Sequence, residues 1–313
     1  MPILILRRIL AAVPVVLIVI TIVFALLRLT PGDPATVIAG DMASPETVSH
    51  IRTELGLDRP LYVQYGAWVA DVVRGRLGNS IQSKKPVADL IAARLEPTFV
   101  LAFAAITLTV LIAVPLGALA AWYRGRWIDK FVLALSIGGF SIPAYVTGYI
   151  LVLTLAIWAD LFPSQGYVSP FQQPILALRH LFLPALTLSL VFVALIARVT
   201  RSSVLEILNE DFVRTARAKG ASDRRILWRH ALPNAAIPIV TVIGVGIAML
   251  ISGVVVTESV FNIPGIGLLT IDAILTRDYP VVQGLILFFA LIFILINLLI
   301  DIVYVIVDPR IRY

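Results

Sequence analysis

Long, uninterrupted runs of apolar residues dominate the chain. A helix needs roughly 20 residues to cross about 30 Å of hydrocarbon, and six of the apolar runs reach that length. We expect them to form transmembrane helices over residues 9–29, 97–122, 131–158, 181–199, 236–257 and 281–307. The pattern predicts an all-α polytopic membrane protein whose residues 1–313 form a single transmembrane domain.

Composition supports this prediction. Of the 313 residues, 59% are hydrophobic and only 14% are charged, whereas about a quarter of the residues in a soluble domain are charged. The chain therefore has too few charges to cover one soluble globule of its length. It contains no cysteine, which excludes disulfides and thiolate ligands from this sequence.

The basic residues predict an orientation in the membrane. Most of the 25 Lys and Arg residues lie at the two termini, around residues 124–130 and between residues 198 and 229. Because Lys and Arg accumulate on the cytoplasmic side, we expect both termini and the loop 200–235 to be cytoplasmic. The loop region 30–96 and the connection 258–280 are then extracytoplasmic. We attribute the net charge of +6 to this orientation and expect no nucleic-acid partner.

The sequence carries no recognisable catalytic constellation. It has no Gly-x-x-x-x-Gly-Lys-Ser/Thr loop, so it cannot hold a nucleotide in that way. The histidines His50, His180 and His230 lack the spacing of a metal pair. Asp301 lies in the last span, where it should face protein or water; a buried hydrogen-bond role and a proton-relay role both remain open. We expect no catalytic residue, no metal site and no cofactor on this chain.

The loop between the fourth and fifth spans has a defined pattern. Apolar residues recur at helical spacing and predict one amphipathic helix. Gly220 supplies a left-handed residue that ends it, Ser222 can cap a second helix over 223–231, and Pro233 marks the return to the membrane. The stripe could pack on the protein's own spans or dock a second protein. Its residues are Leu205, Leu208, Phe212 and Ala216.

This loop resembles that of a known family. Arg214-Thr-Ala216-x3-Gly220, followed by His230-Ala-Leu232-Pro233, is similar to the Glu-Ala-Ala…Gly…Ile-x-Leu-Pro loop of the membrane subunits of bacterial ATP-binding-cassette (ABC) importers. Arg214, Thr215 and His230 depart from the general pattern. These departures resemble the dipeptide/oligopeptide permease branch, which includes glutathione, opine and nickel relatives and in which Arg-Thr-Ala-Arg-Ala-Lys-Gly is the familiar form.

Further segments resemble the same branch in the same order along the chain. They are Pro31-Gly-Asp33-Pro34, Leu55-Gly56-Leu57 with Pro60-Leu-Tyr62-x-Gln64-Tyr65, Gly75-Arg-Leu-Gly78-Asn-Ser80, Ser141-Ile-Pro143, Glu258-Ser-Val-Phe261-Asn-x-Pro264-Gly265-x-Gly267-x-Leu269 and Asp308-Pro-Arg310-Ile-Arg312-Tyr313.

The resemblance implies a type I ABC importer permease-like bundle with a cytoplasmic coupling helix, in the bacterial inner membrane. Such a subunit forms half of the pathway for short peptides, with glutathione as one candidate. The implied partners are a homologous second permease, two ATPase subunits that bind ATP and Mg, an external substrate-binding protein and membrane lipid.

The resemblance and the pattern together point to three groups of candidate functional residues. The implied ATPase-coupling residues are Arg214, Thr215, Ala216, Arg217, Lys219, Gly220, Ala221, Ser222, Asp223, Arg224, His230, Leu232 and Pro233. An outer gate or binding-protein contact, or else a re-entrant plug, is expected at Glu258, Phe261, Asn262, Pro264, Gly265 and Gly267. Pathway lining, or else ordinary helix packing, is expected at Ser136, Ser141, Tyr145, Ser252 and Thr257.

Other functions remain open at this point. A permease of the same family could carry a non-peptide solute such as an opine, a nickel chelate or an oligosaccharide. A stand-alone secondary transporter or channel would leave the cytoplasmic loop without a role. An intramembrane enzyme would need a catalytic pair at bilayer depth, and no such pair is evident in the sequence.

Overall fold

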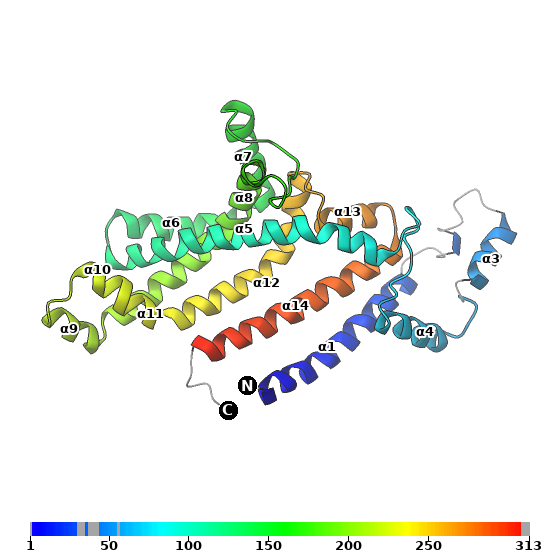
Figure 1. Cartoon of the computed structure of the whole chain (residues 1–313), viewed down its shortest axis with the longest axis horizontal. Coiled ribbons are helices and arrows are strands. Elements are labelled where there is room, and N and C mark those ends of the chain that lie inside the picture. The colour runs from blue at the N-terminus through cyan, green and yellow to red at the C-terminus, as the bar shows by residue number, and fades with distance from the viewer. Residues whose placement is uncertain (1, 30–34, 37–43, 55–56, 308–313) are drawn as a thin grey trace. The chain divides into compact units, whose positions relative to one another are not determined.

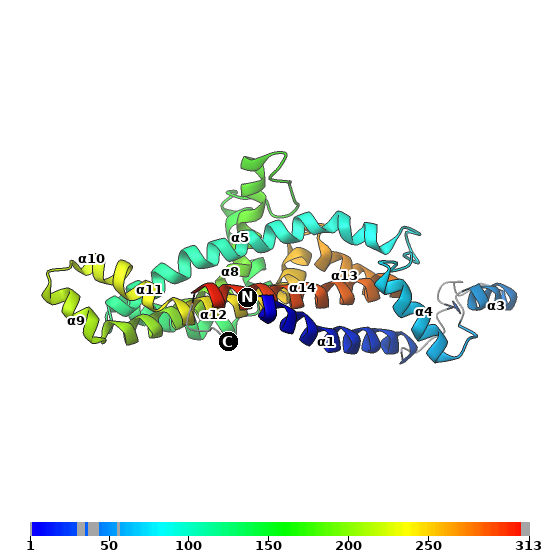
Figure 2. The same ribbon diagram turned by 60° about the horizontal axis from the view of Figure 1, so that its bottom comes forward.

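The computed structural model describes residues 2–29, 35–36, 44–54 and 57–307. These residues are almost entirely helical, and the β pairing among them is one isolated bridge between Asn79 and Pro86. Figures 1 and 2 show the helices from two directions. The segments Pro31–Pro34, Leu55–Gly56 and Asp308–Tyr313, which carry part of the family resemblance, lie outside the described residues.

The longest connections between helices in the described part of the chain are residues 74–86 and 159–173. In chain order the helices are α1 (Pro2–Leu29), α3 (Pro45–Glu54), α4 (Leu61–Val73), α5 (Val87–Trp122), α6 (Trp127–Ser141), α7 (Ala144–Leu151), the π-helix η1 (Val152–Trp158), α8 (Pro174–Leu208), α9 (Asp211–Ala218), α10 (Asp223–Arg225), the π-helix η2 (Ile226–Ala231), α11 (Leu232–Asn234), α12 (Ala236–Val260), α13 (Ile266–Leu275) and α14 (Tyr279–Val307).

The chain divides into two compact units. One joins the residues up to Arg94 with Leu269–Ile294, and the other joins Leu95–Leu268 with the residues from Leu295 onward. The helices α5, α13 and α14 each contribute to both units. The second unit contains the whole loop that resembles the importer family.

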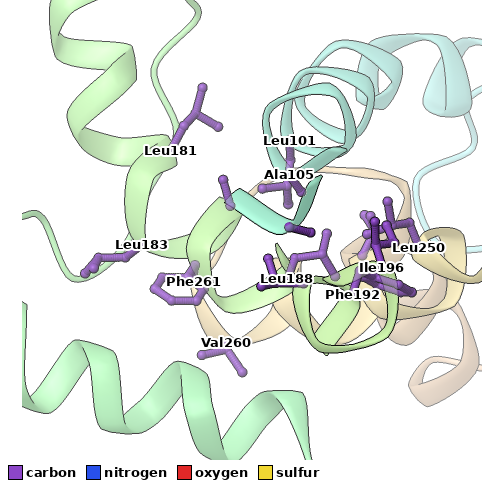
Figure 3. Packing of buried hydrophobic residues seen from close by; sticks show 14 of the residues in the cluster. Leu101, Ala105, Leu181, Leu183, Leu188, Phe192, Ile196, Leu250, Val260 and Phe261 are labelled. Atoms are coloured by element: carbon purple, nitrogen blue, oxygen red, sulfur yellow. The ribbon is translucent and has the colours of Figure 1, made fainter. Parts of the chain in front are cut away.

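Helix α8 forms the centre of the second unit and packs against α6, α7 and α12. Figure 3 shows labelled apolar side chains of α5, α8 and α12 gathered with Phe261. Small residues allow the close approach of helices in a membrane. A Cβ on Gly117 of α5 would lie 2.5 Å from the Ala197 carbonyl, and one on Gly139 of α6 would lie 2.6 Å from the Ala194 Cβ. Glycine is therefore needed where α5 and α6 cross α8.

The described helices account for some of the six predicted spans. Among the described residues, three helices are long and apolar enough to cross a membrane, namely α5, α8 and the Tyr279–Ile300 part of α14. Two further pairs of helices, each bent at a short break, raise the number to five if each pair is one span. The first expected span falls within α1, whose apolar stretch Val13–Ala25 is shorter. Six spans therefore remain a prediction.

The third expected span, 131–158, is a bent pair and not one straight helix. α6 ends at Ser141, and Ile142 is extended, with φ −103° and ψ 119°. The ring of Pro143 disfavours a helical conformation in the residue before it, which explains the position of the break. The loop region 30–96 itself contains helices, among them α3, Pro45–Glu54.

Candidate functional site

The loop between α8 and α12 folds as a helical hairpin, whose arms carry the labels α9 and α10 in Figures 1 and 2. The single amphipathic helix expected through residues 205–216 is wrong. Helix α8 ends at Leu208, Glu210 is extended with φ −70° and ψ 148°, and α9 starts at Asp211. Asn and Asp favour helix ends because their side chains compete for backbone groups.

This break changes which face of α9 is buried. Val213 is 1% exposed and packs inward, while Phe212, expected on the buried stripe, is 43% exposed. Helix α9 packs on η2, so the inward-facing Val213 lies within the hairpin, while Phe212 stays exposed.

The turn after α9 is the one that the sequence predicts. Gly220 has φ +80°; its N–H donates to the Arg217 carbonyl at 3.0 Å, and the Ala221 N–H donates to the Ala216 carbonyl at 3.1 Å. This pair of bonds is the Schellman ending of a helix. No atom lies within 4 Å of a Cβ placed on Gly220, so the backbone conformation, and not crowding, requires glycine here.

The second arm begins at Asp223, as expected, but is longer than predicted. It runs through α10, η2 and α11 to Asn234, so Pro233 lies inside it. Proline removes a donor and crowds the carbonyl four residues earlier, and the wider turn of η2 directly before it relieves that crowding. Ser222 occupies the N-cap position, as expected, with φ −67° and ψ 152°, but its side chain makes no capping hydrogen bond.

The base of the second arm is anchored in an apolar cluster. Leu227 and Ala231 of η2 are buried with Ala118 and Ala121 of α5 and with Val204 of α8. Helix α12 follows at an angle of 63° to the arm. The arm therefore packs directly on α5 and α8, and Ile239 of α12 belongs to the same cluster.

Between the two arms lies a basic hollow of about 630 Å³. Its cationic side chains are Lys219, Arg225 and Arg229, with His230 beside them, and none of its lining residues is acidic. Such a concave positive surface attracts and orients a negatively charged partner. The lining residues are Phe212, Thr215, Ala216, Lys219, Gly220, Ala221, Arg225, Arg229 and His230.

The hollow gathers part of the predicted coupling group. Arg214 instead forms an exposed ion pair with Asp211 on its own helix, at 3.1 Å, and Arg217 and Arg224 are exposed away from the hollow. Sequence reasoning missed Arg225 and Arg229 as site residues. Their i, i+4 spacing, which places two side chains on one helix face, was the available signal.

A buried ion pair lies next to the hairpin base. Asp129, in the first turn of α6, is 3% exposed. Its carboxylate accepts hydrogen bonds from Arg201 of α8, including Nη2 to Oδ2 at 3.0 Å, and from the Gly125 N–H at 2.8 Å. The ion pair and the bond from Gly125 join the connection between α5 and α6 to α8. The sequence pattern gave no indication of this ion pair.

The expected outer segment is organised around one buried carboxylate. Glu258, at the end of α12, is 0% exposed. Its Oε1 accepts from the Thr98 hydroxyl at 2.5 Å and its Oε2 accepts from the Leu268 N–H at 3.1 Å. The Thr98 oxygen in turn accepts from the Ile266 N–H at 2.8 Å. Since anions are stabilised at a helix N-terminus, Glu258 fixes the start of α13 to α12 and α5.

Two glycines make this arrangement possible. A Cβ on Gly265 would overlap the carboxylate of Glu258, and a Cβ on Gly267 would overlap the backbone of Val255. Phe261 is also buried, at 1% exposure, and its carbonyl accepts from the Gly166 N–H at 2.9 Å. Of the predicted outer group, only Asn262 and Pro264 are exposed. The roles of gate and of binding-protein contact stay predictions, and a contact has these two residues available.

The predicted pathway residues are scattered. Ser136 is buried and donates to the Val132 and Ala194 carbonyls, and Thr257 is buried and bonds to the Gly253 carbonyl. Tyr145 is exposed. The side chains of Ser141 and Ser252 lie outside the described set, as does that of Asp301. Pathway lining stays a prediction for these residues.

The sequence matches two families of known proteins that together cover nearly all of it. Residues 113–313 match the binding-protein-dependent transport system inner membrane component. Residues 1–102 match the N-terminal part of a binding-protein-dependent transport system membrane component.

Curated relatives align from end to end. The chain is 48% identical over 309 residues to a probable peptide ABC transporter permease of Sinorhizobium fredii, covering 99% of each chain. It is 45% identical over 310 residues to a putative peptide transport system permease of Brucella abortus, again covering 99% of each. It is 40% identical over 309 residues to the glutathione transport system permease GsiC of Escherichia coli, covering 99% of this chain and 98% of the relative.

Solved structures share the fold. An inward-facing structure of the MetNI methionine ABC transporter superposes with a TM-score of 0.57 at 18% identity, covering 70% of this chain and 96% of the other. An amino acid ABC transporter gives a TM-score of 0.51 at 15% identity, covering 69% and 94%.

Proposed function

Because the chain belongs to the binding-protein-dependent transport system inner membrane components, we propose that it is one of two permease subunits of an ATP-driven importer of short peptides. The two permeases together form the translocation pathway. Relatives that are 40–48% identical over the whole chain and are named for peptide or glutathione transport support this substrate class.

The energy source lies on other chains in this proposal. The sequence has no P-loop, so ATP and Mg are bound by two separate ATPase subunits. The hairpin formed by α9, α10 and η2 docks into them, and its basic hollow receives an acidic segment of the ATPase. This hollow, on a hairpin anchored in the apolar cluster, is the observation that carries the proposed coupling role.

The hairpin converts ATPase closure into movement of the spans. A ligand shifts an equilibrium only by its difference in affinity for the two states, and a shift from 1:99 to 99:1 takes about 5.5 kcal/mol. ATP provides that difference on the partner, so the hairpin must hold the partner in both states. The packing of Leu227 and Ala231 on α5 then carries the movement inward.

The orientation of the chain follows from the same assignment. The hairpin and both termini face the cytoplasm, and the segments 30–96 and 258–280 face outward, where a substrate-binding protein delivers the peptide. Specificity resides mainly in that protein, and the membrane passage binds the peptide weakly enough to release it.

Charge reversal in the hollow tests the proposed function. The complete complex, with both permeases, both ATPases and the binding protein, is reconstituted in liposomes. Peptide-stimulated ATP hydrolysis and uptake of a labelled dipeptide are then measured. The variant R225E/R229E should lose both activities by at least about tenfold, since like charges across an interface cost several kcal/mol. The control R217E, on α9 but outside the hollow, should retain them within about twofold because rim charges contribute little.

Two results would contradict the proposal. Full activity of R225E/R229E would remove the hollow from the coupling interface. Uphill uptake by this chain and its permease partner without the ATPase subunits would refute the ATP-driven mechanism altogether.

A further inference from the structure

Helix α6 has one face turned to the protein and one exposed face. Asp129 and Ser136 are each 3% exposed, and their face packs on α8. On the other face, Trp127 is 75% exposed and Phe131 is 52% exposed. Exposed residues recur there at steps of three and four and therefore share one side of the helix. They form what we call the α6 stripe: Trp127, Phe131, Ala134 and Gly138.

Three basic side chains border the start of the α6 stripe. Arg124 and Arg126 lie in the turn before α6, Lys130 lies in the first turn of the helix, and all three are exposed. Arg126 and Lys130 are four residues apart, which places them on the same flank of the helix, next to Trp127. The Arg126 guanidinium also lies 5.5 Å from the centre of the Tyr123 ring, within the range of a cation–π contact. We call Arg124, Arg126 and Lys130 the basic cluster.

The backbone that carries the basic cluster is held by specific bonds. Gly125 has φ +81°, and its N–H donates to Asp129 Oδ2 at 2.8 Å. The Arg126 N–H donates to the Tyr123 carbonyl at 2.9 Å. Asp129 also accepts from the Arg201 guanidinium of α8, with Nη2 to Oδ2 at 3.0 Å. Since Asp129 is the one acid among residues 123–130, the negative charge of this segment is turned toward α8 and away from the exposed side.

The exposed side of the segment is therefore positively charged. Asp129 and Arg201 compensate each other, and the sequence has no charged residue between positions 97 and 122 of α5. On the adjoining part of α8, the exposed charges are Arg198 and Glu206, which have opposite signs. Within the described part of the chain, the side chains of the basic cluster make no ion pair or hydrogen bond. Three positive charges thus remain uncompensated at the edge of an apolar face.

We propose that the basic cluster and the α6 stripe bind one anionic glycerophospholipid of the cytoplasmic leaflet, with its phosphate at the cluster and an acyl chain along the stripe. This inference rests on the proposed function, which places residues 124–130 on the cytoplasmic side. Anionic lipids of that leaflet attract basic residues, and tryptophan is enriched at the boundary between water and membrane.

The combination of charge and apolar surface distinguishes a lipid from other partners. An acidic protein segment would match the basic cluster but would leave the apolar face that begins beside it uncovered. A neutral lipid would match the stripe but would leave the three positive charges uncompensated. A lipid with a negatively charged head and a hydrocarbon chain matches both parts of the surface.

The experiment identifies what lies against the stripe. In the complete complex, expressed in bacterial membranes that contain phosphatidylglycerol and phosphatidylethanolamine, p-benzoyl-phenylalanine replaces Phe131. After irradiation, mass spectrometry identifies the molecules that are crosslinked to this position. Phosphatidylglycerol should make up a share of the lipid adducts at least about threefold above its share of the membrane, because each basic residue near the surface favours an anionic lipid.

Two variants carry the same probe and lose the same net charge. R126Q/K130Q should lower the share of phosphatidylglycerol among the adducts to its share of the membrane, since the flank beside Trp127 then has no cation. The control R217Q/R224Q removes two exposed cations of the hairpin and should retain the enrichment. Copurification of the ATPase subunits with each variant shows that the complexes are assembled.

Three results would overturn the lipid site. Crosslinking to a permease or another protein in place of lipid would make this face of α6 a subunit contact. Lipid adducts in the proportions of the membrane would make it an ordinary lipid contact without headgroup selection. Equal enrichment in R126Q/K130Q and in the unmodified chain would remove the cations from the site.

Failure of the proposed function is recognised separately. ATP-dependent peptide uptake by the unmodified complex is measured in liposomes made with the same lipids. Absence of that uptake, with the capture of phosphatidylglycerol still dependent on Arg126 and Lys130, would count against the importer function and would support the lipid site.

Discussion

The hairpin between α8 and α12 and the predicted outer segment from Glu258 to Leu268 belong to the same unit, and both combine glycine with proline between apolar helices. The structure uses these residues in opposite ways. Gly220 in the hairpin has a left-handed conformation with open space around it, whereas Gly267 in the outer segment has ordinary φ and is pressed against the backbone of Val255. A glycine in such a connection therefore signals either a left-handed backbone conformation or a close contact, and only in the second case would an added Cβ collide with another part of the chain.

The largest expected effect is that of Gly267→Ala. The added Cβ meets backbone, which cannot move aside, so we expect a loss of about 3 kcal/mol in the free energy of unfolding, at the upper end for overpacking. Gly220→Ala should cost only about 1 kcal/mol, the price of left-handed backbone in alanine. Thermal unfolding of the two purified variants in the same detergent measures the difference. If both variants lost the same free energy of unfolding, Gly267 would not be the more closely packed of the two glycines.

The second effect concerns the buried carboxylate of the outer segment. Glu258→Ala removes the acceptor of the Thr98 hydroxyl and of the Leu268 N–H, and each unsatisfied buried group costs about 1–3 kcal/mol. We expect a total loss of about 2–3 kcal/mol. Glu258→Gln keeps one carbonyl acceptor and should lose roughly half as much. If Gln proved as damaging as Ala in the same unfolding assay, the negative charge itself would be essential.

The third prediction separates stability from coupling. Gly220→Asp should cost no more than about 1 kcal/mol through its backbone conformation, because Asp adopts left-handed backbone at least as readily as Ala, and should insert normally. It should abolish peptide-stimulated ATP hydrolysis, because a carboxylate at the wall of the basic hollow opposes an acidic partner. Gly220→Ala is the control and should keep most of the stimulated activity. Normal stimulation by the Asp variant would remove this wall from the docking surface.

The smallest expected effect is that of Ser222→Ala. A capping serine contributes about 1 kcal/mol when its side chain bonds the helix, and Ser222 makes no such bond. The free energy of unfolding should therefore change by less than about 0.5 kcal/mol, as for most surface substitutions. A loss of 1 kcal/mol or more would show that the hydroxyl caps the arm in the folded protein.

Sequence patterns predicted the helical membrane fold well, because helix periodicity and apolar length are local properties. They also located Gly220 and the start of the second arm at Asp223. They did not predict the break between Leu208 and Asp211, since the apolar stripe continues through it in the sequence while the polar residues at 209–211 end the helix.

The non-local bonds were not predictable in this way. Asp129 with Arg201, Thr98 with Glu258 and Ser80 with Asp278 join residues separated by 72, 160 and 198 positions. A single sequence carries no signal of such pairing. For the same reason, the sequence placed Glu258 in an outer gate, a binding-protein contact or a plug, but gave no sign that the folded chain encloses its side chain.

The ion pair between Asp129 and Arg201 has a mechanical consequence. Arg201 lies two turns before the end of α8, and α8 leads directly into the hairpin. In the coupling that we propose, a movement of the hairpin therefore reaches the bundle along two routes: through α8 to the helices packed on it, and through the Arg201 guanidinium to α6.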